Sequence, residues 1–244
     1  MVVTGGSRGI GAAVARLAGR AGYSVAVMFR QEAHAAQRVV ADVRAAGSSA
    51  VAVQVDVSDE DQVVRAFAAV DTLLGPIRAL VNNAGILEGS KRVTEIGQQR
   101  LTRIMAVNVV GPFLCAREAL RRMSTAHGGA GGAIVNVSSA ASRLGSPGEY
   151  VVYAASKGAI DTFTIGLAHE VAAEGVRVNA VRPGFIETGI HRRGGDPDRL
   201  LRLAPTLPLA RAGQPEEVAE AVLWLLSERA SYVTGAFIDL AGGR

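Results

Sequence analysis

Tyr153 and Lys157 are the two residues whose types and spacing most clearly indicate chemistry. In a helix, side chains four residues apart lie on one face, within reach of a single site. A phenol with a reference pKa of about 10 is a poor base at neutral pH, but a nearby ammonium group favours the phenolate and lowers that pKa. Only two of the 26 basic residues are lysines, so the compact charge of Lys157 stands out. We expect an acid–base pair, although an ordinary amphipathic helix would also place a tyrosine and a lysine together.

Further polar side chains interrupt apolar stretches upstream of this pair. Ser138 and Ser139 follow the apolar residues 134–137, and a hydroxyl there can donate to a substrate oxygen on which negative charge develops. Asn108 lies inside a helical pattern, where asparagine is disfavoured. A local kink that holds a water molecule and a hydrogen-bonded core amide both fit Asn108.

A glycine-rich turn, residues 4–11, lies between the first apolar run and the first helical pattern. Glycines allow a tight turn and close approach of a phosphate, and the helix N-terminus adds amide donors. The turn lacks the Gly-Lys-Ser/Thr of ATP-binding loops, which argues against an ATPase. Alone it also fits a plain glycine turn. The candidate phosphate ligands are Gly5, Ser7, Arg8, Gly9, Ile10 and Gly11.

The end of the second apolar run carries Arg30 where NAD-binding sequences have an acid for the ribose 2′-hydroxyl. Guanidinium groups suit a 2′-phosphate, and Arg8 lies in the glycine turn. The sequence therefore favours NADP(H) over NAD(H), which remains possible. Glu32 is the competing feature, and we expect it to begin the second helix, where an acid complements the helix dipole.

Three more turns follow apolar runs, and in an open α/β sheet such turns meet at the edge where ligands bind. Asp56 and Val57 are placed to meet adenine, although Ser58 or Asp59 capping the next helix explains the same acids. The Asn-Asn-Ala-Gly turn and the Pro-Gly turn are placed to meet the nicotinamide half. Their candidate cofactor ligands are Asn82, Ala84, Gly85, Pro183, Gly184, Ile186 and Thr188.

Short apolar runs alternate with helical patterns along the chain. Strands are predicted over residues 1–4, 24–29, 50–55, 79–81, 132–138, 177–181 and 236–239, and helices over 10–21, 32–46, 60–74, 98–123, 152–173 and 216–226. This alternation predicts one doubly wound (Rossmann) α/β domain over residues 1–244, with about seven parallel strands covered by helices on both faces. The irregular segment 189–211 is predicted to be a lid.

Composition excludes several classes of protein. The single cysteine, Cys115, cannot form an internal disulfide, and its apolar neighbours indicate a buried thiol. We find no metal-ligand spacing, secretion signal or membrane span, which favours a reducing cytoplasm. The net charge of +4 comes from scattered arginines, which argues against nucleic-acid binding.

Taken together, these motifs resemble the short-chain dehydrogenase/reductase family over nearly the whole chain, Thr4 to Gly243. Residues 142–150 and 237–243 are similar to bacterial glucose or sugar 1-dehydrogenases within it. The resemblance implies Tyr153 as general acid and base, Lys157 lowering its pKa and holding the nicotinamide ribose, and Ser139 orienting the carbonyl. It also implies that Asn108 holds a relay water and that Arg8 goes with NADP. Thirteen residues separate Ser139 from Tyr153, one more than the usual spacing, which keeps Ser138 open.

The expected function is hydride transfer between NADP(H) and a small carbonyl or secondary-alcohol substrate. A 3-oxoacyl-thioester reductase is an alternative, with His191, Arg192 and Arg193 meeting an anionic substrate or acyl-carrier protein. A non-catalytic NADP(H)-binding regulatory module is the alternative from another class. The family resemblance further implies a homotetramer, or a dimer, with the helices of 98–123 and 152–173 at the interface.

Overall fold

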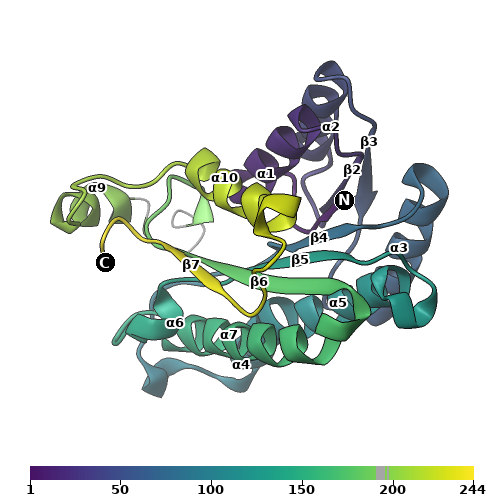
Figure 1. Ribbon diagram of the computed structural model, residues 1–244. Coiled ribbons are helices and arrows are strands. Elements are labelled where there is room, and N and C mark those ends of the chain that lie inside the picture. Colours follow the sequence, from purple (N-terminus) through teal and green to yellow (C-terminus); the bar gives the residue numbers. More distant parts are fainter. Residues whose placement is uncertain (191–195, 197) are drawn as a thin grey trace.

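A single parallel sheet of seven strands runs through the computed structural model, which describes residues 1–190, 196 and 198–244. The strand order is β3-β2-β1-β4-β5-β6-β7 (Figure 1). The strands are β1 (Val2–Val3), β2 (Val25–Phe29), β3 (Ala50–Gln54), β4 (Ala79–Asn82), β5 (Gly132–Val137), β6 (Val176–Pro183) and β7 (Phe237–Leu240). The predicted doubly wound α/β class is confirmed, and each predicted strand is present. β1 has only two residues, yet both pair with β2 on one side and β4 on the other.

The helices agree with the sequence pattern except in one long segment. They are α1 (Gly9–Arg20), α2 (Ala33–Ala45), α3 (Glu60–Leu74), α4 (Gln98–Met105), α5 (Gly111–Met123), α6 (Ala141–Leu144), α7 (Val151–Val171), α9 (Arg199–Leu203) and α10 (Pro215–Leu226). The single helix predicted over 98–123 is divided by a π turn, Ala106–Val110. The short helices α6 and α9 were not predicted, because four or five residues are too few to show a helical period.

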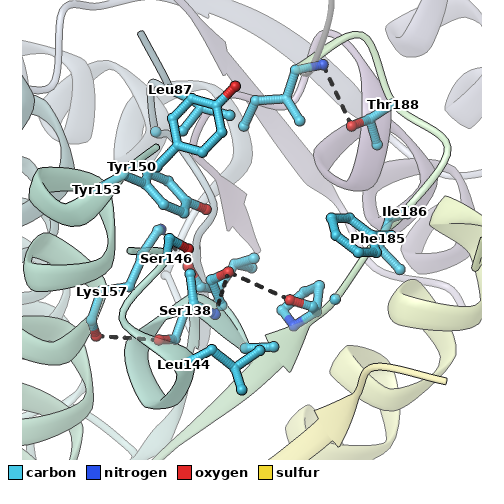
Figure 2. A pocket seen from close by; sticks show the side chains of 18 of the residues that line it. Leu87, Ser138, Leu144, Ser146, Tyr150, Tyr153, Lys157, Phe185, Ile186 and Thr188 are labelled. Atoms are coloured by element: carbon cyan, nitrogen blue, oxygen red, sulfur yellow. Dashed lines mark hydrogen bonds between the residues drawn. The ribbon is translucent and has the colours of Figure 1, made fainter. Parts of the chain in front are cut away.

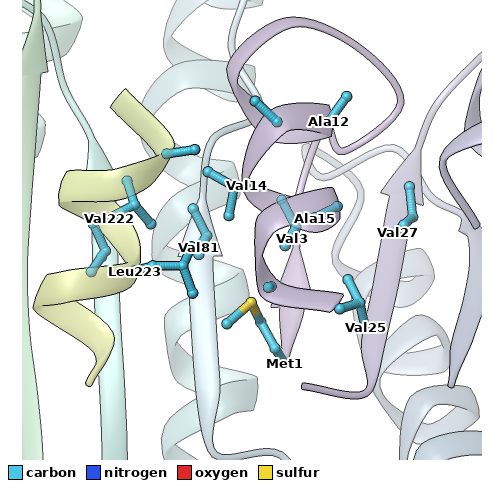
Figure 3. Packing of buried hydrophobic residues seen from close by; sticks show 14 of the residues in the cluster. Met1, Val3, Ala12, Val14, Ala15, Val25, Val27, Val81, Val222 and Leu223 are labelled. Atoms are coloured by element: carbon cyan, nitrogen blue, oxygen red, sulfur yellow. The ribbon is translucent and has the colours of Figure 1, made fainter. Parts of the chain in front are cut away.

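Apolar side chains fill both faces of the sheet, which explains why its strands are almost continuously apolar. On one face α1, α2 and α10 pack against the sheet, with Val14 and Ala15 of α1 beside Val222 and Leu223 of α10 (Figure 3). On the other face α3, α5 and α7 cover the strands around the buried Phe67. Two packed layers hold the sheet edge, and the turns on it, in fixed positions.

The chain reverses its winding direction at β1, whose neighbours are β2 and β4. The glycine turn follows β1 and the Asn-Asn-Ala-Gly turn follows β4, so both meet at this switch point. In open α/β sheets ligands bind in the crevice outside the carboxyl ends of the strands at such a point.

Part of the predicted lid, 189–211, is present as α9 and a 3₁₀ turn, Ala204–Thr206. His191, Arg192 and Arg193 lie outside the described residues. No helix within the described ranges has both the length and the apolar character needed to cross a bilayer.

Candidate active site

A cavity of about 320 Å³ opens at the carboxyl edge of the sheet. Figure 2 shows the rings of Tyr150 and Tyr153 on one wall, and the Phe185 ring and the Ile186 side chain on the opposite wall. The sequence-predicted residues that line it are Ile10, Gly85, Ser139, Tyr153, Lys157, Pro183, Gly184, Ile186 and Thr188. The cavity therefore brings together Ser139, Tyr153 and Lys157 and the turns expected to hold the nicotinamide half of a cofactor, whereas Asn108, the fourth expected catalytic residue, is not among its lining residues.

Tyr153 lies in the first turns of α7, and its phenol stands beside Ser139. Burial raises the pKa of Tyr153 above its usual value, and hydrogen bonding to Ser139 partly opposes the rise. The Ser139 hydroxyl also lies 3.5 Å from the Pro183 carbonyl oxygen and accepts from the Ala141 amide at 3.1 Å. Two hydroxyl groups thus face the cavity at one point, where a substrate oxygen could accept from both.

Lys157 is buried one helical turn after Tyr153, with its Nζ 5.7 Å from the centre of the Tyr153 ring. Nζ donates to the Val137 carbonyl oxygen at 2.7 Å. Burial lowers the pKa of Lys157 to about 8, and the charge of Asp161 opposes this. The sequence predicts that Lys157 lowers the pKa of Tyr153, whereas in the structure burial dominates and raises it.

The structure separates the two candidate serines. Ser138 is buried and donates to the Asp161 carboxylate at 2.6 Å, and its Oγ also lies 3.2 Å from the Lys157 carbonyl oxygen. Asp161 also pairs with Arg182 at 3.0 Å. Both serines line the cavity, but the hydroxyl of Ser138 is engaged by Asp161 of α7, whereas Ser139 is the serine beside Tyr153.

Asn108 sits in the π turn between α4 and α5 and is fully buried. Its Oδ1 accepts from the Ile86 amide at 2.8 Å, and its Nδ2 donates to the Ile86 carbonyl oxygen at 3.0 Å and the Ser156 hydroxyl at 3.1 Å. The predicted kink is present, because a π turn inserts one residue into the helix. Both amide hydrogens are used within the protein, so a water could be held only by the remaining Oδ1 lone pair or by the main chain.

Thr4 and Asn83 lock the glycine turn to the turn after β4. Asn83 Nδ2 donates to the carbonyl oxygens of Thr4 at 2.9 Å and Gly5 at 3.1 Å. Thr4 Oγ1 in return accepts from the amides of Asn83 at 2.9 Å and Ala84 at 3.0 Å. Sequence reasoning named Asn82 and Ala84 here and missed Asn83. The Asn82 side chain instead donates to Asn136 Oδ1 at 3.0 Å, buried within the sheet.

The glycine turn fits a phosphate-bearing cofactor. Gly5 and Gly9 have positive φ angles of 61° and 54°, which favour glycine. A Cβ on Gly9 would lie 3.3 Å from the Thr188 side chain, so a larger residue would close the space between the turn and the Pro-Gly loop. The N-cap of α1, Arg8, makes no side-chain cap bond, which leaves the helix amides available to an anion.

Four charged side chains surround the position expected for the ribose. Arg8 pairs with Glu32 at 3.2 Å, and Arg30 lies 3.6 Å from Asp56. Glu32 is the N-cap of α2, as expected, but its side chain faces Arg8 and makes no cap bond. Asp56 also accepts from the Ser58 hydroxyl at 2.6 Å. Both arginines are about half exposed, so either can leave its acid for a phosphate.

Two further observations limit the possible chemistry. Cys115 is buried, and burial raises the pKa of its thiol to about 12, which makes it a poor nucleophile. Among the described residues no cluster of three or more His, Cys, Asp or Glu side chains is arranged to hold a metal ion.

Tyr150, Phe185 and Arg199 also line the cavity, and sequence reasoning did not identify them. Tyr150 carries a visible signal, since it lies three residues before Tyr153. Arg199 offers no such signal in this arginine-rich chain. It enters the cavity wall because α9 folds back over the site (Figure 1).

An open parallel sheet with a glycine turn at its switch point and a Tyr-Lys pair beside it defines a nucleotide-binding oxidoreductase. Residues 5–244 match a family model described as enoyl-(acyl carrier protein) reductase. The chain belongs to the short-chain dehydrogenase/reductase family of oxidoreductases, whose members use NAD(H) or NADP(H).

Three relatives illustrate the range of this similarity. The uncharacterized oxidoreductase YgfF of Escherichia coli K12 is 59% identical over 100% of this chain and 98% of its own. A cis-4-hydroxycyclohexanecarboxylate dehydrogenase of Sinomonas cyclohexanicum is 39% identical over 99% of this chain and 94% of its own. The crystal structure of a short-chain dehydrogenase from Burkholderia cenocepacia in complex with NADP is 30% identical, covers 99% of this chain and 96% of its own, and has a TM-score of 0.91. None of the three is described as a sugar dehydrogenase, so the narrower resemblance expected from residues 142–150 and 237–243 is not supported.

Proposed function

We propose that this protein is an NADP(H)-dependent oxidoreductase that interconverts a carbonyl compound and a secondary alcohol. One observation carries the proposal. Ser139, Tyr153 and Lys157 converge in a cavity that also contains the turns suited to a nicotinamide dinucleotide. Geometry and family membership agree on this reaction class, and the substrate itself is addressed below.

The proposed chemistry assigns one task to each side chain. The cofactor, when bound, supplies or accepts the hydride. Tyr153 donates its phenolic proton to the carbonyl oxygen in reduction and takes a proton from the alcohol in oxidation. Ser139 donates a hydrogen bond to the same oxygen and so orients it. The Lys157 ammonium group stabilises the phenolate that Tyr153 becomes after it has given up its proton.

Substitution of Tyr153 tests the central assignment. Tyr153→Phe removes the transferable proton and leaves the ring, so we expect turnover to fall by roughly 10²–10⁴-fold while NADPH still binds. The measurements are NADPH oxidation with a panel of ketones, aldehydes and sugars, and NADPH titration by nicotinamide fluorescence. Full activity in Tyr153→Phe would remove Tyr153 from the mechanism. If the wild-type protein binds NADPH but turns over nothing in the panel, the non-catalytic regulatory module becomes the better reading.

The preference for NADP(H) rests on Arg8 and Arg30. A 2′-phosphate can replace Glu32 and Asp56 as the partner of these two guanidinium groups, which lie in the glycine turn and after β2. NAD(H) lacks the 2′-phosphate and gains nothing from them at that position. Glu32 could instead accept a hydrogen bond from the ribose 2′-hydroxyl of NAD(H), and this possibility favours NAD(H).

A pair of titrations tests this preference. We expect NADPH to bind the wild-type protein at least about tenfold more tightly than NADH, and Arg8→Gln with Arg30→Gln to remove most of that difference. Arg16→Gln is the matched control, because Arg16 lies about two turns into α1, beyond the glycine turn, and is also paired with an acid, Asp42, at 2.7 Å. Tighter binding of NADH would reverse the assignment and point to Glu32.

Two narrower activities fit the same site. A relative described as a 3-oxoacyl-[acyl-carrier-protein] reductase, from Staphylococcus aureus, is 35% identical over 99% of this chain, which favours a 3-oxoacyl-thioester reductase as the alternative enzyme. A sugar 1-dehydrogenase remains a third substrate class. All three use the same Ser139–Tyr153–Lys157 chemistry, so only a substrate panel separates them.

The proposal includes the setting of the enzyme. We place it in the cytoplasm as a homotetramer or a dimer that acts on a small molecule and binds neither nucleic acid nor membrane. Exposed apolar side chains support the assembly, since Val110, Phe113 of α5 and Ile165 of α7 are each more than two-fifths exposed. They come from the two segments that the family resemblance assigns to the interface.

A further inference from the structure

Tyr150 places a buried hydroxyl group at the cavity without giving it a partner. The residue is only 5% exposed, and its Oη makes no hydrogen bond with any of the described residues. Buried polar groups in proteins are almost always hydrogen-bonded, so such an atom beside a ligand cavity indicates that a ligand satisfies it. The proposed mechanism does not use Tyr150, because Tyr153 and Ser139 already provide the two hydroxyls at the reacting oxygen.

A series of rings and guanidinium groups leads from Tyr150 to Phe185 on the opposite wall of the cavity. The Arg199 guanidinium carbon lies 4.9 Å from the centre of the Tyr150 ring and 5.5 Å from that of Phe185. The Arg244 guanidinium carbon lies 4.8 Å from the Phe185 ring. All four side chains line the cavity. We call Tyr150, Phe185, Arg199 and Arg244 the arginine strip.

The charge of the arginine strip is positive. Arg199 is buried and held by Glu149 through two hydrogen bonds of 2.9 and 2.5 Å, which balances its charge and fixes its position. A guanidinium group has five N–H donors, so three remain for other partners. Asp196 lies 4.0 Å from the Arg199 guanidinium group. Arg244 is exposed and forms no ion pair with an acidic side chain among the described residues. Arg244 is therefore the cation of the strip that lacks an acidic side-chain partner.

We propose that the arginine strip binds an anionic group of the substrate, a carboxylate in the simplest case, at the far end of the molecule from the reacting carbon. This inference rests on the proposed function, since it assigns a substrate class to the same cavity. Tyr150 Oη donates to the carboxylate, and Arg244 supplies the opposite charge. Arg199 positions Tyr150 and Phe185 and offers its remaining donors. Tyr153 and Ser139 then meet the carbonyl at the other end.

The probes are three oxo acids of increasing length, 4-oxopentanoate, 5-oxohexanoate and 6-oxoheptanoate, each compared with its methyl ester. Isothermal titration calorimetry measures their affinities in the presence and absence of NADP⁺. NADP⁺ cannot reduce a ketone, so binding is measured without turnover. For at least one length we expect the wild-type protein to bind the acid about tenfold or more tightly than the ester, as a charge-assisted hydrogen-bond pair would give.

Substitutions in the arginine strip test whether it causes the preference for the acid over its methyl ester. We expect the acid-over-ester preference to fall to about twofold or less in Arg244→Gln and by roughly three- to tenfold in Tyr150→Phe. Arg20→Gln is the control, since it removes one exposed surface charge at the end of α1 and should leave the preference unchanged. Tyr150→Phe should also unfold no more easily than the wild type, because the lost hydroxyl makes no hydrogen bond with the described residues.

The results of these binding experiments can be distinguished from the results of the turnover assays that test the proposed function. Equal binding of acid and ester at every length, or a preference that survives in Arg244→Gln, would overturn the carboxylate assignment. Tighter binding of the neutral 5-hydroxypentan-2-one than of any acid would overturn it in favour of an uncharged polar group. NADPH oxidation with the same ketones is assayed separately. A protein that binds the acids selectively but reduces none of them would contradict the proposed function, while carboxylate binding by the arginine strip would still be supported.

Discussion

The catalytic tyrosine shows how burial and a neighbouring charge compete at one residue. Burial raises the pKa of Tyr153, while burial also lowers the pKa of Lys157 to about 8. Each shift disfavours the charged form of its group, as expected for two titratable side chains in a poorly hydrated cavity. Burial therefore holds Tyr153 as a neutral phenol at neutral pH, which is the form that reduction needs.

These directions predict opposite pH dependences for the two directions of the reaction. Carbonyl reduction uses the protonated phenol, so its kcat/KM should be highest at neutral pH and fall as the pH rises. Alcohol oxidation uses the phenolate, and burial raises the pKa of Tyr153, so kcat/KM for oxidation should rise with pH from neutrality across the measured range. Initial rates between pH 6 and 10, measured in both directions with one substrate pair, check this. An oxidation rate that is highest near pH 6 would contradict the role of Tyr153 as the titrating base.

Single residues also mark where sequence reasoning reached its limit. The pairing of Tyr153 and Lys157 could be predicted from the sequence because residues four positions apart in a helix project from the same face. The choice between Ser138 and Ser139 was not visible, since it depends on which hydroxyl reaches Asp161 across the fold. For the same reason Asn82 was named as a candidate cofactor ligand and Asn83 was not. The contacts that separate the two asparagines join residues about 80 positions apart.

At the scale of elements, the helices and strands followed from local pattern while their interruptions did not. The seven strands were recognisable because burial on both faces makes them continuously apolar. Asn108 was recognised as a possible kink, but the predicted helix was not divided there, because the apolar period of 98–123 continues through it. The extra residue becomes necessary only when Asn108 must reach the Ile86 backbone. Tertiary contacts of this kind leave little trace in a local pattern.

The junction between α1 and the turn after β4 leads to a prediction about Gly11. A Cβ on Gly11 would lie 2.4 Å from Asn83 Nδ2 and 2.5 Å from the Gly5 carbonyl oxygen, so the hydrogen bonds that lock the two turns together would have to break. We expect Gly11→Ala to lower the free energy of unfolding by about 1–3 kcal/mol. NADPH affinity, measured by fluorescence titration, should fall at least about tenfold, because the phosphate cradle would be distorted.

Gly166→Ala is the matched control for Gly11→Ala. Gly166 lies in the exposed part of α7, and a Cβ there would meet no heavy atom within 4 Å. Alanine in a helix interior is favoured over glycine by about 1 kcal/mol, so this variant should be as stable as the wild type or more so. Denaturant unfolding compares the two. If Gly11→Ala behaved like Gly166→Ala, close approach of the two turns would not explain the glycine.

For the whole molecule, the outer surface of the α4–α5–α7 layer bears on assembly. Leu101, Val110, Phe113 and Ile165 are each between 43% and 48% exposed on this layer. Phe113 stacks on Phe163 with ring centres 3.8 Å apart, which fixes its ring on the outside of the helix. Clustered apolar side chains on an otherwise polar surface mark an interface, and a second copy of the same chain is the occupant that the family resemblance implies.

The homo-oligomer proposal predicts that one charge on this surface weakens assembly. The wild-type protein should sediment at about two or four times its chain mass of 25.2 kDa. Phe113→Arg should lower the sedimenting mass, because closing the interface would bury an unpaired guanidinium group at a cost of several kcal/mol. Leu73→Arg is the control, since Leu73 is 58% exposed on α3, a helix that the family resemblance does not assign to the interface, and should leave the mass unchanged. Analytical ultracentrifugation at several concentrations decides the matter. A wild-type mass of one chain, or equal dissociation of both variants, would show that this surface is not the interface.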